Sequence, residues 1–176
     1  METTKNKIPE NQQIFFENLK NYLDTKIYFF GSVQRPDYFK ESSDIDAAIF
    51  TDNIKGIIYK MQIFLDKEPD DFKKVVWKIT NDNSIVNGFK VKYKNKEEKF
   101  VTEISIYDIK YKEKILEEYN AKKDLPFYAT WSLIFIKFLF YKLGIIPLEL
   151  FLYLKNFILT VMISKKDNEY VVLSYK

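Results

Sequence analysis

The sequence YFFGSVQRPDYFKESSDIDAAIF, residues 28–50, contains the features that decide the fold. It connects two short apolar segments, 26–30 and 44–50, through a polar loop. The first segment contains Ile, Tyr and Phe, and the second contains Ile, Ala and Phe. Short apolar runs bounded by turn residues predict buried β-strands. The first segment ends at Gly31-Ser32. A glycine there lets the backbone approach a bound phosphate closely, so that amide groups can donate to the phosphate oxygens.

Two aspartates open the second predicted strand. Asp44 and Asp46 are two residues apart, so both side chains point to one face, while Ile45 points to the other. Carboxylates on one face repel each other unless a cation lies between them, and hard oxygen ligands suit Mg²⁺ or Mn²⁺. An isolated Asp-x-Asp is more often a solvated strand edge, but the apolar flanks and the preceding Gly-Ser favour a metal site. Arg35, the single arginine, adds a planar cation that suits phosphate.

The composition excludes several kinds of chemistry. The 176 residues include no cysteine and no histidine, which excludes disulfides, typical zinc sites, and Ser-His or Cys-His catalysis. Any reaction therefore depends on Asp, Glu, Lys, Ser, Thr or Tyr, or on a metal ion held by carboxylates. A net charge of +3 does not indicate a strong nucleic-acid binder.

The rest of the chain alternates helical and strand-like patterns, which predicts an α/β (α+β) fold with a mixed β-sheet flanked by helices. We expect residues 1–108 to form a core and residues 109–176 to form a C-terminal helical subdomain that packs on it. Helices are predicted at 9–26, 53–67, 110–120, 127–143 and 147–163, and strands at 26–30, 44–50, 74–80, 88–94, 99–108 and within 169–176.

The segments FFGSVQR and SSDIDAAIF resemble the DNA polymerase beta-like nucleotidyltransferase superfamily, in particular its minimal nucleotidyltransferases and their antitoxin relatives. That family has an apolar strand ending in Gly-Ser, about ten further residues, and then an apolar-flanked Asp-x-Asp. The resemblance extends over residues 9–107. In this chain Pro36 follows the arginine, where those proteins often have Gly, and the loop is about one residue longer.

The resemblance implies a nucleotidyltransferase fold with residues 1–108 as its catalytic core, and it implies roles for individual residues. The family has a third acid on a later strand beside the Asp-x-Asp strand. Glu103 and Asp108 are the candidates, and we favour Glu103 because it lies in the middle of its predicted strand. The implied catalytic and metal-binding residues are Asp44, Asp46 and Glu103, and the implied nucleotide-binding residues are Gly31, Ser32, Arg35 and Ser43.

The hairpin formed by 88–94 and 99–108 provides a separate expectation. If Asn95–Glu98 is a four-residue loop, Lys94 pairs with Lys99 and Lys90 lies opposite Glu103. Lys90, Lys92 and Lys94 then share a face with Glu103, which predicts a basic stripe beside the metal site. A solvated lysine face is the simpler interpretation of the same pattern.

The function that the resemblance implies is transfer of a nucleoside monophosphate from a nucleoside triphosphate, such as ATP, to an acceptor hydroxyl, with release of pyrophosphate. Mg²⁺ or Mn²⁺ would be the cofactor and the triphosphate the substrate. The acceptor is open: a protein, an RNA or DNA end, or a small molecule. Two alternatives are a compact DNA polymerase similar to the X family, and an antitoxin-like partner-binding module with a nucleotidyltransferase fold.

Residues 127–163 are very apolar, so a membrane segment has to be considered. Charged side chains such as Lys137 and Lys155 interrupt the run, and Gly144 and Pro147 break it, so no uncharged stretch of about 18 residues remains. We therefore expect two packed helices without membrane insertion, whose apolar surface is suited to homo- or hetero-oligomer contacts. The polar N-terminus lacks an apolar signal core, which predicts a cytoplasmic protein.

Overall fold

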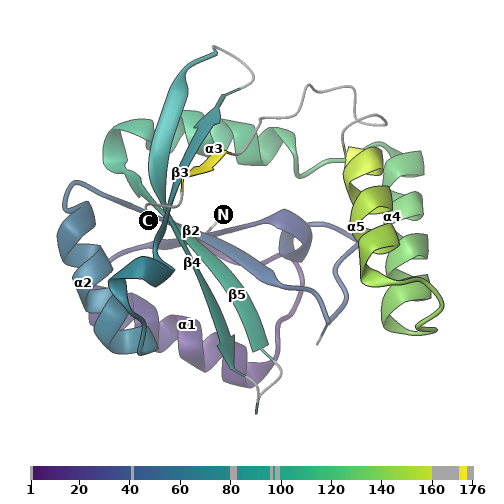
Figure 1. Ribbon diagram of the computed structural model, residues 1–176, viewed down its shortest axis with the longest axis horizontal. Helices are drawn as coiled ribbons and strands as arrows, with labels where there is room; N and C mark the ends of the chain where they lie inside the picture. Colours follow the sequence, from purple (N-terminus) through teal and green to yellow (C-terminus); the bar gives the residue numbers. More distant parts are fainter. Residues whose placement is uncertain are drawn as a thin grey trace.

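The structure, a computed structural model, describes residues 2–40, 42–79, 83–95, 97, 100–159 and 171–173 (Figure 1). It is a mixed α/β fold, and most predicted elements are present with shifts of a few residues at their ends. The elements in chain order are α1 (Glu10–Leu23), β1 (Ile27–Phe30), η1 (Gly31–Gln34), β2 (Ile45–Thr51), α2 (Ile54–Leu65), η2 (Pro69–Asp71), β3 (Lys73–Lys78), β4 (Ile85–Asn95), β5 (Phe100–Asp108), η3 (Ile109–Tyr111), α3 (Lys112–Ala121), α4 (Phe127–Tyr141), α5 (Leu148–Phe157) and β6 (Val171–Leu173).

The strands form one mixed sheet in the order β1-β2-β5-β4-β3-β6. β2 pairs parallel with β5, and the other neighbouring strands pair antiparallel. Because β2 and β5 are parallel, their amino-terminal halves lie side by side. This arrangement brings the start of β2 next to the first half of β5.

The two faces of the sheet carry different helices. On one face α1 and α2 pack side by side, and Leu19 and Met61 are fully buried in that core. On the opposite face α3 contributes Ile115 and Tyr119 to a second core with Trp77. Residues of β2 alternate between the two cores, which agrees with the period of two expected for a strand buried on both sides.

Helices α4 and α5 pack together beside the sheet rather than over its centre (Figure 1). Their shared core contains Leu133, Ile136, Phe151 and Ile158. Many of their other large apolar side chains are exposed, among them Phe127, Trp131, Phe135, Leu148, Tyr153 and Phe157. Among the described helices, none is both long enough and apolar enough to span a membrane.

The predicted register of the β4–β5 hairpin was wrong by two residues. Asn95 pairs with Phe100, and Lys92, not Lys90, lies opposite Glu103. The side chain of Asn95 accepts a hydrogen bond from the backbone of Glu97, so Asn95 starts the turn from within the strand. A shift of two keeps every side chain on its face. The basic stripe of Lys90, Lys92 and Lys94 therefore still shares a face with Glu103.

Candidate active site

Three strands bring the predicted acidic residues to one place. Asp46 is the register partner of Glu103 in the parallel β2–β5 pair, and of Phe30 in the antiparallel β1–β2 pair. Gly31 follows Phe30 directly, so the Gly-Ser turn lies beside the same carboxylate. Asp44 comes just before β2 and is exposed. The strand order alone thus explains why residues more than fifty positions apart meet.

The turn after β1 is a 3-10 turn, Gly31–Gln34, and Gly31 has a φ of 70°. That left-handed conformation is unfavourable for residues with a Cβ. A Cβ at position 31 would also overlap the Asp46 carboxylate, because Oδ2 of Asp46 lies against the Gly31 backbone. Glycine is therefore required here for two separate reasons, and the second one links the turn to Asp46.

We expect Gly31→Ala to displace Asp46 and to reduce any reaction at this site by about a hundredfold, since a shift of about 1 Å at a reacting centre has an effect of that order. Pyrophosphate release measures the reaction, and urea unfolding measures the stability. Gly144→Ala is the matched control, because Gly144 also has a positive φ, 62°, but a Cβ added there would have nothing within 4 Å. Equal activity in the two variants would contradict the proposed contact.

The site carries opposing charges in close contact. Burial raises the pKa of Asp46 to about 6, and the negative charge of Glu103 adds to the effect. Lys90 Nζ donates to Glu103 Oε2 at 3.0 Å. Lys92 Nζ lies 3.5 Å from Asp44 Oδ2 and 3.9 Å from Glu103 Oε1. In this state the lysines of β4 therefore compensate part of the negative charge.

Asp44, Asp46 and Glu103 are the carboxylates expected to bind the metal ion that the sequence predicts. Within the described part of the chain, no group of three or more acidic side chains is already arranged to hold a metal ion. Lys92 contacts oxygens of both Asp44 and Glu103, where such an ion would be bound. The chemistry of the carboxylates fits a hard divalent cation.

Behind the turn lies a buried ionic network. Arg35 donates to both oxygens of Asp37, with Nε to Oδ1 at 2.7 Å. Lys137 of α4 donates to Asp37 Oδ2 at 2.8 Å and to the Asp37 carbonyl at 2.7 Å. Asp37 is 0% exposed and Lys137 is 3% exposed. The network ties the loop after β1 to α4.

The pKa values of this network reflect a balance between burial and ionic contacts. Burial alone raises the pKa of the Asp37 carboxyl, but hydrogen bonds and charge from Arg35 and Lys137 outweigh it and leave the pKa lowered. Burial lowers the pKa of Lys137, and Asp37 opposes that shift. The Arg35 guanidinium is therefore engaged with Asp37, so its geometry favours a role in fixing the loop over direct phosphate binding.

A cavity of about 250 Å³ joins these groups. Its lining includes every predicted site residue together with cationic and aromatic groups of α4 and α5. The lining residues are Gly31, Ser32, Arg35, Ser43, Asp44, Asp46, Glu103, Lys137, Tyr141, Lys155 and Leu159. The lining thus combines three carboxylates with the cations Arg35, Lys137 and Lys155, which suits a molecule with both a metal ion and phosphates.

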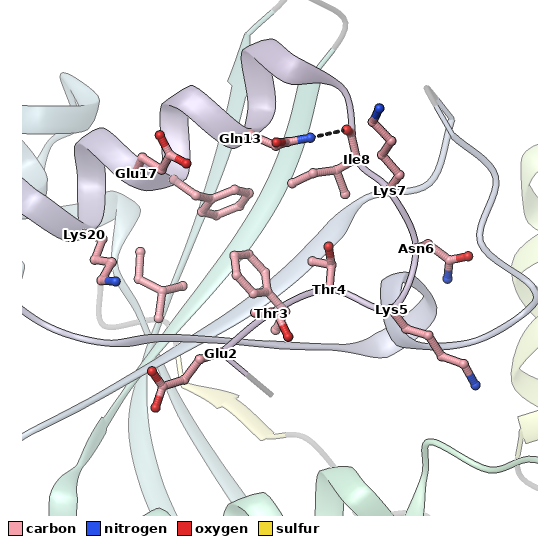
Figure 2. Close-up of a pocket in the computed structure, with 13 residues that line it drawn as sticks. Glu2, Thr3, Thr4, Lys5, Asn6, Lys7, Ile8, Gln13, Glu17 and Lys20 are labelled. Atoms are coloured by element: carbon pink, nitrogen blue, oxygen red, sulfur yellow. Dashed lines mark hydrogen bonds between the residues drawn. The ribbon is translucent and has the colours of Figure 1, made fainter.

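A larger cavity, about 570 Å³, lies between the N-terminal segment, α1 and β1 (Figure 2). Its two acidic residues, Glu2 and Glu17, lie on opposite sides of the cavity in Figure 2. Basic residues Lys5, Lys7 and Lys20 accompany them, and the floor is apolar. The lining of this larger cavity has no converging carboxylates and no glycine turn. The smaller cavity is therefore the better candidate for chemistry, although its volume is less.

The other predicted residues are placed as follows. The hydroxyl of Ser43 accepts a hydrogen bond from the Phe39 backbone at 3.1 Å, so Ser43 also closes the loop before Asp44. Asp108, the alternative third acid, pairs with Thr51 at the far end of the β2–β5 pair. It accepts a hydrogen bond from the Lys110 backbone, which lowers its pKa. Glu103, not Asp108, lies beside Asp46.

Residues that sequence reasoning missed brace the turn from behind. Asn6 donates to the carbonyls of Val33 and Arg35 at 3.0 and 2.7 Å. Gln34 donates to the Thr3 carbonyl at 2.7 Å. These contacts connect the N-terminal segment to the loop, and the local sequence pattern around Asn6 and Gln34 gave no signal for them.

Comparison with known proteins provides one family match. The family model described as "Nucleotidyltransferase domain" matches residues 12–125. No curated protein sequence matches the chain.

Several solved structures resemble the fold weakly. A Cid1 poly(U) polymerase structure has a TM-score of 0.40 at 13% identity and covers 77% of this chain and 43% of its own. A Cid1 structure with MgGTP bound has a TM-score of 0.42 at 15% identity, covering 77% and 44%. The STING-associated CdnE c-di-GMP synthase from Capnocytophaga granulosa has a TM-score of 0.31 at 18% identity, covering 72% and 44%. The chain spans less than half the length of these structures.

Proposed function

Because the chain belongs to the nucleotidyltransferase domain family, we propose that it transfers a nucleoside monophosphate from a nucleoside triphosphate to an acceptor hydroxyl. Family membership confirms the predicted superfamily, the fold class and the class of enzyme. Metal dependence, the site residues and the acceptor belong to the proposal. The observation that carries it is the cavity in which Asp46 and Glu103, register partners, lie beside the Gly31-Ser32 turn.

The triphosphate would bind between the turn and the C-terminal helices. The backbone of Gly31 and the backbone and hydroxyl of Ser32 line the cavity and would donate to the β- and γ-phosphates. Lys155 would add positive charge from α5, whereas the ammonium of Lys137 is engaged with Asp37. Arg35 would act through Asp37 by keeping the loop in place. The phosphates are thus held between one rigid turn and two helices.

Asp44, Asp46 and Glu103 would hold the predicted Mg²⁺ or Mn²⁺, which when bound lowers the pKa of the acceptor hydroxyl and neutralises the phosphate charge. The acceptor oxygen forms a bond to the α-phosphorus while the bond from that phosphorus to the β-phosphate bridging oxygen breaks. Pyrophosphate leaves with the electron pair of that bond. Glu103 would accept the proton of the hydroxyl, which is consistent with a chain that has no histidine.

The test is incubation of the protein with each labelled nucleoside triphosphate, ATP included, and with RNA, DNA, protein and small hydroxyl compounds as acceptors. The assay is run with Mg²⁺, with Mn²⁺ and with EDTA. We expect label transfer and pyrophosphate release only with a divalent ion. Transfer at an undiminished rate in EDTA would overturn the metal dependence, and no transfer to any acceptor would overturn the function.

The exposed apolar side chains of α4 and α5 support a second candidate, the partner-binding module. Contact with another chain through these helices stays a prediction, and light scattering of the purified protein measures it. The compact polymerase alternative has no comparable support, because the net charge of +3 provides few cations for duplex DNA. DNA among the acceptors tests that alternative directly.

A further inference from the structure

The hairpin register puts a lysine where a metal ion is expected. Lys92 is the cross-strand partner of Glu103 in the β4–β5 pair. Its ammonium lies 3.9 Å from Glu103 Oε1 and 3.5 Å from Asp44 Oδ2. One cationic group therefore contacts two of the three proposed metal ligands, which come from different parts of the chain.

The contact of Lys92 with these two carboxylates is weak and can be broken. The Lys92 side chain is 56% exposed, and the two distances are long for charge-assisted hydrogen bonds. Exposed ion pairs of this kind contribute little, so a divalent ion that binds the same oxygens can displace the ammonium. The lysine stem is long and flexible, so its head can turn into solvent without a change in the backbone.

Lys90 differs from Lys92 in geometry. Its ammonium donates to the other oxygen of Glu103, Oε2, at 3.0 Å, and its side chain is less exposed. A metal ion bound to the opposite oxygen of Glu103 would leave this hydrogen bond in place. Lys90 therefore orients Glu103, while Lys92 lies between the carboxylates.

We propose that Lys92 is a counter-ion of the metal site, a role that rests on the proposed function. Its ammonium compensates the charge of Asp44 and Glu103 when no metal is bound, and it competes with the divalent ion for them. Removing its charge should tighten metal binding and lower the stability of the metal-free protein only slightly. Keeping its charge should preserve both properties.

The experiment measures binding of Mn²⁺ alone to the full chain, without nucleotide, from the electron paramagnetic resonance signal of the free ion. We expect Lys92→Met to bind Mn²⁺ about fivefold more tightly than the wild type, the effect of about 1 kcal/mol. Lys92→Arg should bind like the wild type. Lys94→Met is the matched control, since Lys94 lies on the same face but opposite Val101. Its affinity for Mn²⁺ should not change.

A second measurement is the melting temperature in EDTA and in Mn²⁺, where Lys92→Met should show the larger increase on adding Mn²⁺. Unchanged or weaker Mn²⁺ binding in Lys92→Met would overturn the counter-ion role, while a wild type that still binds Mn²⁺ would leave the proposed function standing. If neither protein binds Mn²⁺, the metal site and the counter-ion role both fail. Binding only in Lys92→Met supports competition.

Discussion

Replacing Asp46 with Asn should reduce nucleotidyl transfer by about a thousandfold and, without metal, raise the melting temperature. Loss of a metal ligand removes several kcal/mol of transition-state stabilisation, about 4 kcal/mol for a factor of a thousand. The stability change has the opposite sign because burial and Glu103 make the charge of Asp46 unfavourable in the folded protein. Pyrophosphate release measures the first effect, and thermal unfolding in EDTA measures the second.

The pKa of Asp46 determines the sign of this stability change. The pKa of Asp46 is about 6 in the folded protein and 3.8 without the fold, so the folded state binds more protons between these values. The wild type therefore gains stability as the pH falls through 6, and the gain is complete near pH 3.8. Partial exposure reduces the ionisation cost to about 1–2 kcal/mol, or about 3–6 °C, at pH 7.5. The advantage of Asp46→Asn should vanish near the lower pKa.

Asp108→Asn is the matched control for this experiment. The pKa of Asp108 is lowered by Lys110, so its charge is favourable and its removal should lower the melting temperature slightly. Because Asp108 lies at the far end of β5, transfer should be retained. If Asp108→Asn loses transfer while Glu103→Gln keeps full activity, then Asp108 and not Glu103 is the third acid of the proposed mechanism.

The second large effect concerns the buried network behind the turn. Asp37→Ala should lower the free energy of unfolding by about 3–5 kcal/mol, because it leaves the buried cations Arg35 and Lys137 without their shared partner. Urea unfolding of the purified protein measures this loss. At about 2–4 °C per kcal/mol, the melting temperature should fall by roughly 10 °C.

Lys137→Met separates charge balance from simple loss of contacts. It removes one cation and keeps the Arg35–Asp37 pair, so the loss should be only about 1–2 kcal/mol. Equal destabilisation by the two substitutions would show that Asp37 does not hold two charges together. An intact fold in Asp37→Ala at full stability would rule out the network as a stabilising element.

The strands and the carboxylate pair could be predicted because each depends on local pattern. The run 44–50 is apolar apart from its two aspartates, which necessarily share a face once the run is a strand. The position of Glu103 within its own strand favours it over Asp108, and the β2–β5 register places it beside Asp46. Its role in catalysis stays a prediction.

The hairpin register and the loop contacts could not be predicted from local pattern. Registers that differ by two residues bury the same side chains, so alternation could not distinguish Lys90 from Lys92 as the partner of Glu103. Phe100 pairs with Asn95 and packs against Phe15 and Phe16, and such contacts appear only in three dimensions.

Lys137 illustrates the same limit. In sequence it interrupts an apolar helix, which by itself argues only against a membrane segment. Its partner, Asp37, is 100 residues away. A lone lysine within an apolar helix can still be a useful signal, because a buried ammonium requires an anionic partner.

The contact between Lys137 and Asp37 also bears on how the molecule opens. Closing a loop of 100 residues costs about 4 kcal/mol of chain entropy, so this contact depends on the surrounding fold to bring its two ends together. The α4–α5 pair has its own core, and the ionic contact between Lys137 and Asp37 joins it to the loop after β1. Amide hydrogens of α4 and α5 should therefore exchange through a partial opening, ahead of those of β2 and β5. The candidate nucleotide cavity, whose wall these helices form, then becomes accessible in a protein whose central sheet is still folded.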